Sequence, residues 1–189
     1  HQATAEPRWL DAAGRLLDTA LAHFADGSGG FYDTADDAEQ LVRRPKDPTD
    51  NATPSGSSAL AASLASYSAL TGSYEHRVAA ENALRIVSEL GTRQPRFVGW
   101  ALAAAEALAA GPLQIAIVGE AGGGPLTRTA WLRRPDGAVV VSGAPDAPDV
   151  PLLAGRPLVR GMPAAYVCRG MVCDLPVTDQ QALLAQLTR

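Results

Sequence analysis

Hydrophobic residues recur with helical spacing through the first part of the chain. Between residues 7 and 25 apolar side chains return every three or four positions, which is the stripe of an amphipathic helix. The same pattern predicts three further helices, at residues 54–72, 74–90 and 95–110. The connections at 71–73 and 91–94 are short, and short connections place consecutive helices antiparallel. We therefore predict successive helical hairpins over residues 1–111.

The pattern changes after Gly111, where short runs rich in β-branched residues begin. The predicted strands are residues 113–118, 138–141 and 164–168, with a return strand at 171–174, and the predicted helices are 125–133 and 179–187. Thr53 and Thr178 are expected to cap the helices that follow them. Strand–helix–strand order predicts a parallel pair of strands with a right-handed crossover. The fold class is therefore mainly α, followed by a small α/β tail with a short, partly parallel sheet over residues 112–189.

The charge balance excludes several function classes. The 189 residues include 16 Lys and Arg against 20 Asp and Glu, which gives a formal net charge of −4. Because the basic residues are scattered, neither a nucleic acid nor an acidic membrane surface is expected as a partner. No apolar run approaches the roughly 18 residues that span a bilayer, and no signal peptide is recognised. We expect a cytoplasmic protein.

A long polar connection at residues 31–54 is the first candidate site. Loops longer than about 15 residues in a compact domain are usually either functional or disordered. Leu41 and Val42 give this loop apolar side chains to pack, so we expect it to be ordered. Its acidic start holds three aspartates, Asp33, Asp36 and Asp37. These carboxylates can line a cleft, bind hydroxyl groups or act as acid–base groups. A solvated acidic turn is the alternative that composition alone favours.

The residues before the second predicted helix form another candidate site. Asp50 and Asn51 stand just ahead of the helix N-terminus, and the main-chain N–H groups of Ser55 and Gly56 lie in its first turn. Helix N-termini bind anions and phosphates readily. Alternatively these polar residues cap the helix and brace the loop. Capping contributes on the order of 1 kcal/mol, which would explain their presence, and the sequence leaves both alternatives open.

Cys168 and Cys173 flank four residues between two predicted strands. That spacing fits a hairpin loop, in which the two cysteines can face each other and form a disulfide. A redox role is a weaker interpretation, because C-x-x-C is the usual signature of thiols with a lowered pKa. Two buried thiols or a structural pair are favoured over it.

Two segments bear on cofactors and metals. Residues 117–125 place a strand, glycines and a helix in the order of a phosphate loop, but they match no nucleotide-binding motif and lack its lysine. Zinc would need ligands besides the two cysteines, and His23 and His76 have no spacing relation to them. We therefore predict no cofactor and no metal.

Three segments together resemble a known family: GGFYDTADD (29–37), RRPKDPTDNATPSG (43–56) and PAAYVCRGMVCDLPVTD (163–179). They are similar to the C-terminal part of thioredoxin-domain-containing proteins, which include the spermatogenesis-associated thioredoxin-like proteins. The resemblance implies a thioredoxin-like domain, then an α/α toroid of the six-hairpin glycosidase type, then a short α/β segment. It also implies that this chain is a C-terminal fragment that holds only the last hairpins and the tail.

The resemblance further implies a role in carbohydrate chemistry, because the toroid is similar to those of N-acylglucosamine 2-epimerases and related isomerases. Asp33 is then the candidate catalytic group. The candidate ligand-binding residues are Tyr32, Arg44, Lys46, Asp47, Asp50, Asn51 and Ser55. The expected partners are the missing toroid and thioredoxin-like portion or a second copy, and a small polar or sugar ligand. The alternatives are redox chemistry at Cys168 and Cys173, or a non-enzymatic interaction scaffold.

Overall fold

The computed structural model describes residues 1–39, 42–120, 123–170 and 172–188. The chain divides into two compact units. A helical unit comprises Asp11–Ser68 and Ser73–Ala110, and an α/β unit comprises His1–Leu10, Ala69–Gly72 and Gly111–Arg189. The sequence pattern places the change from helical to mixed structure after residue 111, but it does not anticipate that residues 1–10 and 69–72 join the α/β unit. An α-rich fold with an α/β tail is confirmed.

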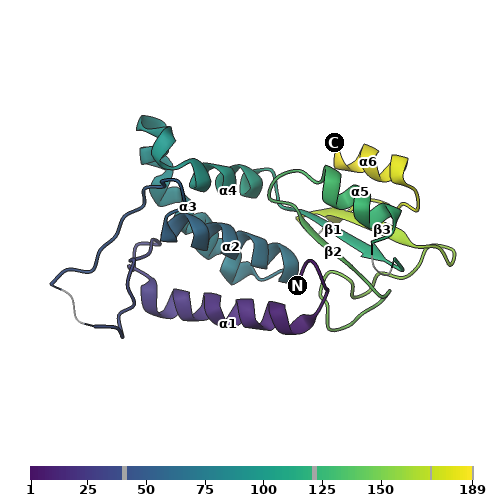
Figure 1. Cartoon of the computed structure of the whole chain (residues 1–189), viewed down its shortest axis with the longest axis horizontal. Coiled ribbons are helices and arrows are strands. Elements are labelled where there is room, and N and C mark those ends of the chain that lie inside the picture. The colour runs from purple at the N-terminus through teal and green to yellow at the C-terminus, as the bar shows by residue number, and fades with distance from the viewer. Residues whose placement is uncertain (40–41, 121–122, 171, 189) are drawn as a thin grey trace. The chain divides into compact units, whose positions relative to one another are not determined.

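Four α-helices make up the first part of the chain (Figure 1). They are α1 (Pro7–Phe24), α2 (Gly56–Thr71), α3 (Tyr74–Arg93) and α4 (Gly99–Ala109), with a short 3₁₀ helix η1 (Pro95–Phe97) before α4. In the helical unit one apolar core draws on all four helices, from Leu17, Leu64, Leu84 and Leu108 among others. The predicted helices are therefore confirmed, with shifted ends.

Each shift in a helix end has a local cause. α2 begins two residues later than predicted because the Ser55 hydroxyl, rather than that of Thr53, accepts the N–H of Ser58, at 3.1 Å. α3 continues through Gly91. Because this residue has no side chain, the Leu102 side chain of α4 can pack closely against α3 there. Val98 separates η1 from α4, because its φ of −138° and ψ of 31° are not helical.

The α/β unit contains a four-stranded mixed sheet in the order β2–β1–β3–β4. Its strands are β1 (Leu113–Val118), β2 (Val139–Gly143), β3 (Ala164–Arg169) and β4 (Val172–Cys173). β1 pairs in parallel with β2 and antiparallel with β3, and β4 adds to β3 as an antiparallel edge. The predicted parallel pair and the return strand are both confirmed.

Helices α5 (Pro125–Arg133) and α6 (Gln180–Leu187) lie side by side against the sheet (Figure 1). Ile115, Val140 and Val167 share an apolar cluster with side chains of both helices. Because strand side chains alternate between faces, Cys168 points to the face opposite these helices. The cap of α6 is the Asp179 side chain, which accepts the Ala182 N–H at 2.9 Å, so the assignment of this role to Thr178 is wrong.

Among the helices of the described residues, none has both the length and the apolar character needed to cross a membrane.

Candidate functional site

The motif loop, residues 26–56, brings Asp33 and Asp47 together. The main-chain N–H of Asp33 donates to the carbonyl of Pro45 at 2.9 Å, and the Asp33 carboxylate accepts the N–H of Asp47 at 3.0 Å. The Asp47 carboxylate in turn accepts from the N–H and the hydroxyl of Thr49, and these bonds lower the pKa of Asp47. Both aspartates are exposed. A ligand can reach both carboxylates.

The Arg44 side chain of the motif loop is bonded within the protein. Its guanidinium donates to the carbonyls of His23, at 3.0 Å, and Thr34, at 2.5 Å, and stacks over the Tyr32 ring at 4.1 Å. Arg44 and Tyr32 therefore connect the end of α1 to both arms of the loop, so that their first role is to hold the loop's path.

Lys46 is engaged in the same way, because its ammonium forms an ion pair with Asp26. The Asp26 side chain is only 5% exposed. Burial by itself would raise the pKa of Asp26, but Lys46 and hydrogen bonds from Ser28 and Gly30 outweigh it and hold that pKa far below its usual range. The ion pair therefore neutralises Lys46, which the sequence analysis predicts to bind a ligand.

Asp50 joins the loop to two helices. It is 6% exposed, and its carboxylate accepts main-chain N–H groups from Ser55 at 2.9 Å, Trp100 at 2.8 Å and Ala101 at 3.3 Å. Burial would raise the pKa of Asp50, whereas these bonds and one from Ser58 lower it overall. Asp50 thus caps α4, and Ser55 caps α2. The sequence left open a cap on α2 alone, whereas the cap that Asp50 forms on α4 was not predicted.

The remaining predicted positions of the loop are at its surface. Asn51 is exposed, and its side-chain oxygen accepts only the neighbouring N–H of Ala52 at 3.1 Å. Val42 is fully exposed, so the expectation that it packs is wrong. Leu41 lies outside the described residues. Phe31, by contrast, is buried and anchors the start of the loop.

Sequence reasoning missed the contacts of His23 with two aspartates of the motif loop. The His23 ring nitrogen Nδ1 lies 2.8 Å from Asp36 and 3.6 Å from Asp37. The hydrogen bond to Asp36, with the charge of Asp37, raises the pKa of His23. One ligand atom from each residue lies within 4.8 Å of the others, as cation ligands do, but all three are at least partly exposed and the hydrogen bond accounts for their approach.

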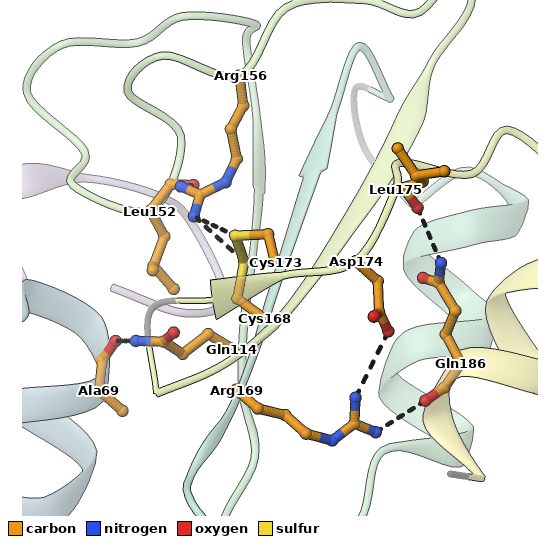
Figure 2. Close-up of a disulfide and its surroundings, with 10 residues drawn as sticks. All are labelled: Ala69, Gln114, Leu152, Arg156, Cys168, Arg169, Cys173, Asp174, Leu175 and Gln186. Atoms are coloured by element: carbon orange, nitrogen blue, oxygen red, sulfur yellow. Dashed lines mark hydrogen bonds and ion pairs between the residues drawn. A yellow bond between two sulfur atoms is a disulfide. The ribbon is translucent and has the colours of Figure 1, made fainter.

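A disulfide links Cys168 and Cys173 across β3 and β4 (Figure 2). The two residues are directly opposed in the ladder, as the hairpin interpretation requires. The alternative of two buried thiols is wrong: the cysteines are bonded, and they differ in exposure. Cys168 is 1% exposed, whereas Cys173 is exposed on the edge strand.

Arg156 lies against this disulfide. One guanidinium nitrogen is 3.5 Å from the sulfur of Cys168 and 3.7 Å from that of Cys173 (Figure 2). The other terminal nitrogen donates to the carbonyl of Leu152, and the Tyr166 ring lies 5.9 Å from the guanidinium carbon. Burial lowers the pKa of Arg156, and Tyr166 opposes this; an arginine nevertheless stays charged at neutral pH.

The segment that follows β4 is tied to α6 on the other side of the disulfide (Figure 2). Arg169 pairs with Asp174 at 3.5 Å and donates to the carbonyl of Gln186 at 2.9 Å. The Gln186 amide donates to the carbonyl of Leu175 at 2.8 Å. The chain is therefore held in place directly after Cys173.

The Glu120 side chain, which follows β1, occupies the N-terminus of α5. The Glu120 carboxylate accepts the N–H groups of Leu126 at 3.0 Å and Thr127 at 2.8 Å in the first turn of α5. A carboxylate of the protein thus occupies the position where a phosphate would bind. An open hollow of about 1060 Å³ lies beside it, and there the Thr127 and Ser142 hydroxyls bond each other at 3.0 Å.

Two places therefore carry candidate chemistry, the exposed carboxylates of the motif loop and the disulfide with its arginine. Arg156 could not be recognised from the sequence, because it lies 12 and 17 residues from the cysteines in a proline-rich stretch without a motif. No protein-family model matches the sequence, and no curated protein matches it either.

Proposed function

We propose that the protein takes part in thiol–disulfide exchange through Cys168 and Cys173. The observation that carries this proposal is the unequal exposure of the pair: Cys173 is open to solvent on an edge strand, whereas Cys168 is buried. Exchange begins when an external thiolate reaches a disulfide sulfur, so access to one sulfur is the first requirement.

The reaction needs a dithiol as its co-reactant. The first thiolate of the dithiol attacks one sulfur of the disulfide and forms a mixed disulfide, while the other cysteine leaves as a thiolate. The second thiol of the dithiol then displaces the remaining cysteine. Two electrons and two protons pass to the pair, which ends as two cysteine thiols, and the dithiol ends as a disulfide. The reverse sequence oxidises a partner dithiol.

The reduction potential of the pair tests this proposal. The protein is equilibrated with dithiothreitol buffers of graded potential, its thiols are alkylated, and the mass shift counts them. We expect two thiols to appear at potentials less negative than about −300 mV, the value below which structural disulfides usually lie. Circular dichroism should show that the reduced protein stays folded. Reduction only below that potential, or only on unfolding, would mean that the disulfide is structural.

A second candidate retains the polar or sugar ligand that the family resemblance implies. Its support is the exposure of Asp33 and Asp47, which are linked by the bond from the main-chain N–H of Asp47 to the Asp33 carboxylate. Asp33 also faces the first turn of α2, since a Cβ added to Gly56 would lie 3.9 Å from its carboxylate. Arg44, Lys46 and Asp50 contribute less to this candidate, because protein groups already bind them.

The α/α toroid that the resemblance implies also belongs to this proposal. Its support is the sequence of helices α2, α3 and α4, which follow one another and share one core. On α1, Trp9 is 50% exposed and Leu16 is 71% exposed. Further toroid helices, or a second copy of the chain, would cover these apolar side chains. A native mass of 19.6 kDa, that of the lone chain, would argue against the second copy.

A further inference from the structure

Arg156 is held so that its charge faces the disulfide. Its main-chain N–H donates to the carbonyl of Leu153 at 3.2 Å, and its own carbonyl accepts the N–H of Asp146 at 3.2 Å. The bond from the guanidinium to Leu152 fixes the far end of the side chain. With both ends anchored, one terminal nitrogen remains for the two sulfurs (Figure 2).

Among the described residues, the guanidinium also has no anionic partner. In the described parts of the chain, the ion pairs of the other arginines involve Glu6, Glu81 and Asp174, and none includes Arg156. A partly buried charge is costly unless it is paired. A disulfide carries no charge, but reduction creates a thiolate at the same position. Reduction would therefore supply the anion that this cation lacks.

We propose that Arg156 is a catalytic residue of the exchange reaction: it stabilises the Cys168 sulfur as the departing thiolate and so directs the incoming thiol to Cys173. This inference rests on the proposed thiol–disulfide exchange. Cys173 is the exposed residue of the pair and so the expected point of attack, and Cys168 is the buried leaving group. A buried thiolate without a cation would be a poor leaving group, because burial raises the pKa of a thiol.

The order of steps follows from this arrangement. The first thiolate of the dithiol forms a bond to the sulfur of Cys173, and the Cys168–Cys173 bond breaks with its electron pair on the Cys168 sulfur. Arg156 donates to that thiolate. The second thiol of the dithiol then displaces Cys173, and protons from the dithiol and from solvent complete the two cysteine thiols according to their pKa values.

Other charged and titratable groups near the pair act less directly. Tyr166 lies beside Arg156, and its phenol donates to the carbonyl of Pro157 at 2.7 Å, while burial and the charge of Asp146 raise the pKa of Tyr166. On the opposite side, Arg169 is paired with Asp174. We therefore assign the stabilising charge to Arg156 alone.

The test compares Arg156→Met with the wild-type protein, and uses Arg160→Met as the matched control. Arg160 is an exposed arginine of the same loop, so its replacement removes the same charge. After reduction, iodoacetamide alkylation is followed against pH, and mass spectrometry of peptides assigns each thiol. We expect the more acidic thiol of the wild type to titrate about one unit or more below the usual 8.5. In R156M its pKa should rise by about one unit, which slows alkylation at pH 6.5 about tenfold.

Further variants separate charge from packing. R156K keeps the positive charge and should recover most of the shift, and R160M should leave it unchanged. With excess glutathione as a monothiol probe, the trapped adduct should map to Cys173. A wild-type protein whose two thiols both titrate at or above about 8.5 overturns the assignment, and so does an adduct on Cys168. In either case a disulfide that still exchanges leaves the proposed function standing, whereas a pair that cannot be reduced in the folded protein removes that function first.

Discussion

The motif loop and the disulfide hairpin both place charged groups near the surface, but these groups have different partners. In the loop, Lys46 is bound by Asp26, and the Asp50 carboxylate accepts three main-chain N–H groups. At the hairpin, Arg156 faces two neutral sulfur atoms. In the loop, the charged groups bond within the protein and stabilise its conformation. At the hairpin, the charge of Arg156 can still interact with a thiolate that forms when the disulfide is reduced.

The difference matters because an ion that is already paired gains little from a ligand. A new anion at Lys46 would have to displace the Asp26 carboxylate and leave it buried without its cation, which is costly. A thiolate beside Arg156 displaces nothing. A distinctive sequence motif can therefore reflect the bonds that a particular loop conformation needs. The residue that takes part in the chemistry can be an arginine outside any motif.

The largest expected effect is on the loop side of this comparison. Asp50→Ala leaves the N–H groups of Ser55, Trp100 and Ala101 without their acceptor in a buried position. We expect the free energy of unfolding to fall by roughly 2–4 kcal/mol, measured by urea denaturation. Such a loss would identify Asp50 as part of the framework.

Asp47→Ala is the matched control for Asp50→Ala. Asp47 carries the same charge in the same loop, but it is exposed and accepts only from Thr49. Its replacement should lower the free energy of unfolding by less than about 1 kcal/mol. Equal losses in the two variants would show that burial of Asp50 does not matter, and the interpretation of the loop as a brace would have to be abandoned.

The elements of this fold could largely be predicted from the sequence. The strand at 113–118 and the helix at 125–133 agree residue for residue, because a β-branched run and a Gly–Pro boundary define them locally. The helix ends at Ser55 and Asp179 were missed by one or two residues. Neighbouring threonines have the same capping chemistry, and tertiary packing decides which side chain faces the helix.

The sites were less predictable, for a physical reason. Local sequence shows that Cys168 and Cys173 can meet across a hairpin, since they are only five positions apart along the chain. It does not show that Arg156 reaches them, or that Trp100 and Ala101 donate to Asp50 from 50 and 51 residues away. These contacts depend on how distant segments pack, and a single sequence carries no signal of that packing.

Acid should weaken the loop by a smaller amount than the loss of Asp50. The pKa of Asp26 is lower in the folded chain than in the unfolded chain, so its contribution to stability is complete above the unfolded value, near 3.8, and is lost as pH falls below it. We expect Asp26→Asn to cost on the order of 1–2 kcal/mol at pH 7 and less at pH 3, by urea unfolding at each pH. A cost that does not change with pH would mean that the Lys46 pair contributes no net stability.

The smallest expected effects are at Asp33 and Asn51, and they decide between a brace and a binding surface. Both side chains are exposed and accept one main-chain N–H each, so Asp33→Ala and Asn51→Ala should each lower the free energy of unfolding by less than about 1 kcal/mol. Saturation-transfer NMR with N-acetylglucosamine then tests binding in the same variants. A signal in the wild type that disappears in D33A and persists in N51A would show that the loop binds a sugar through Asp33. That outcome would place ligand recognition in the loop despite its internal bonds. Only Arg44, Lys46 and Asp50 would then remain as loop residues whose charges serve the loop's own conformation.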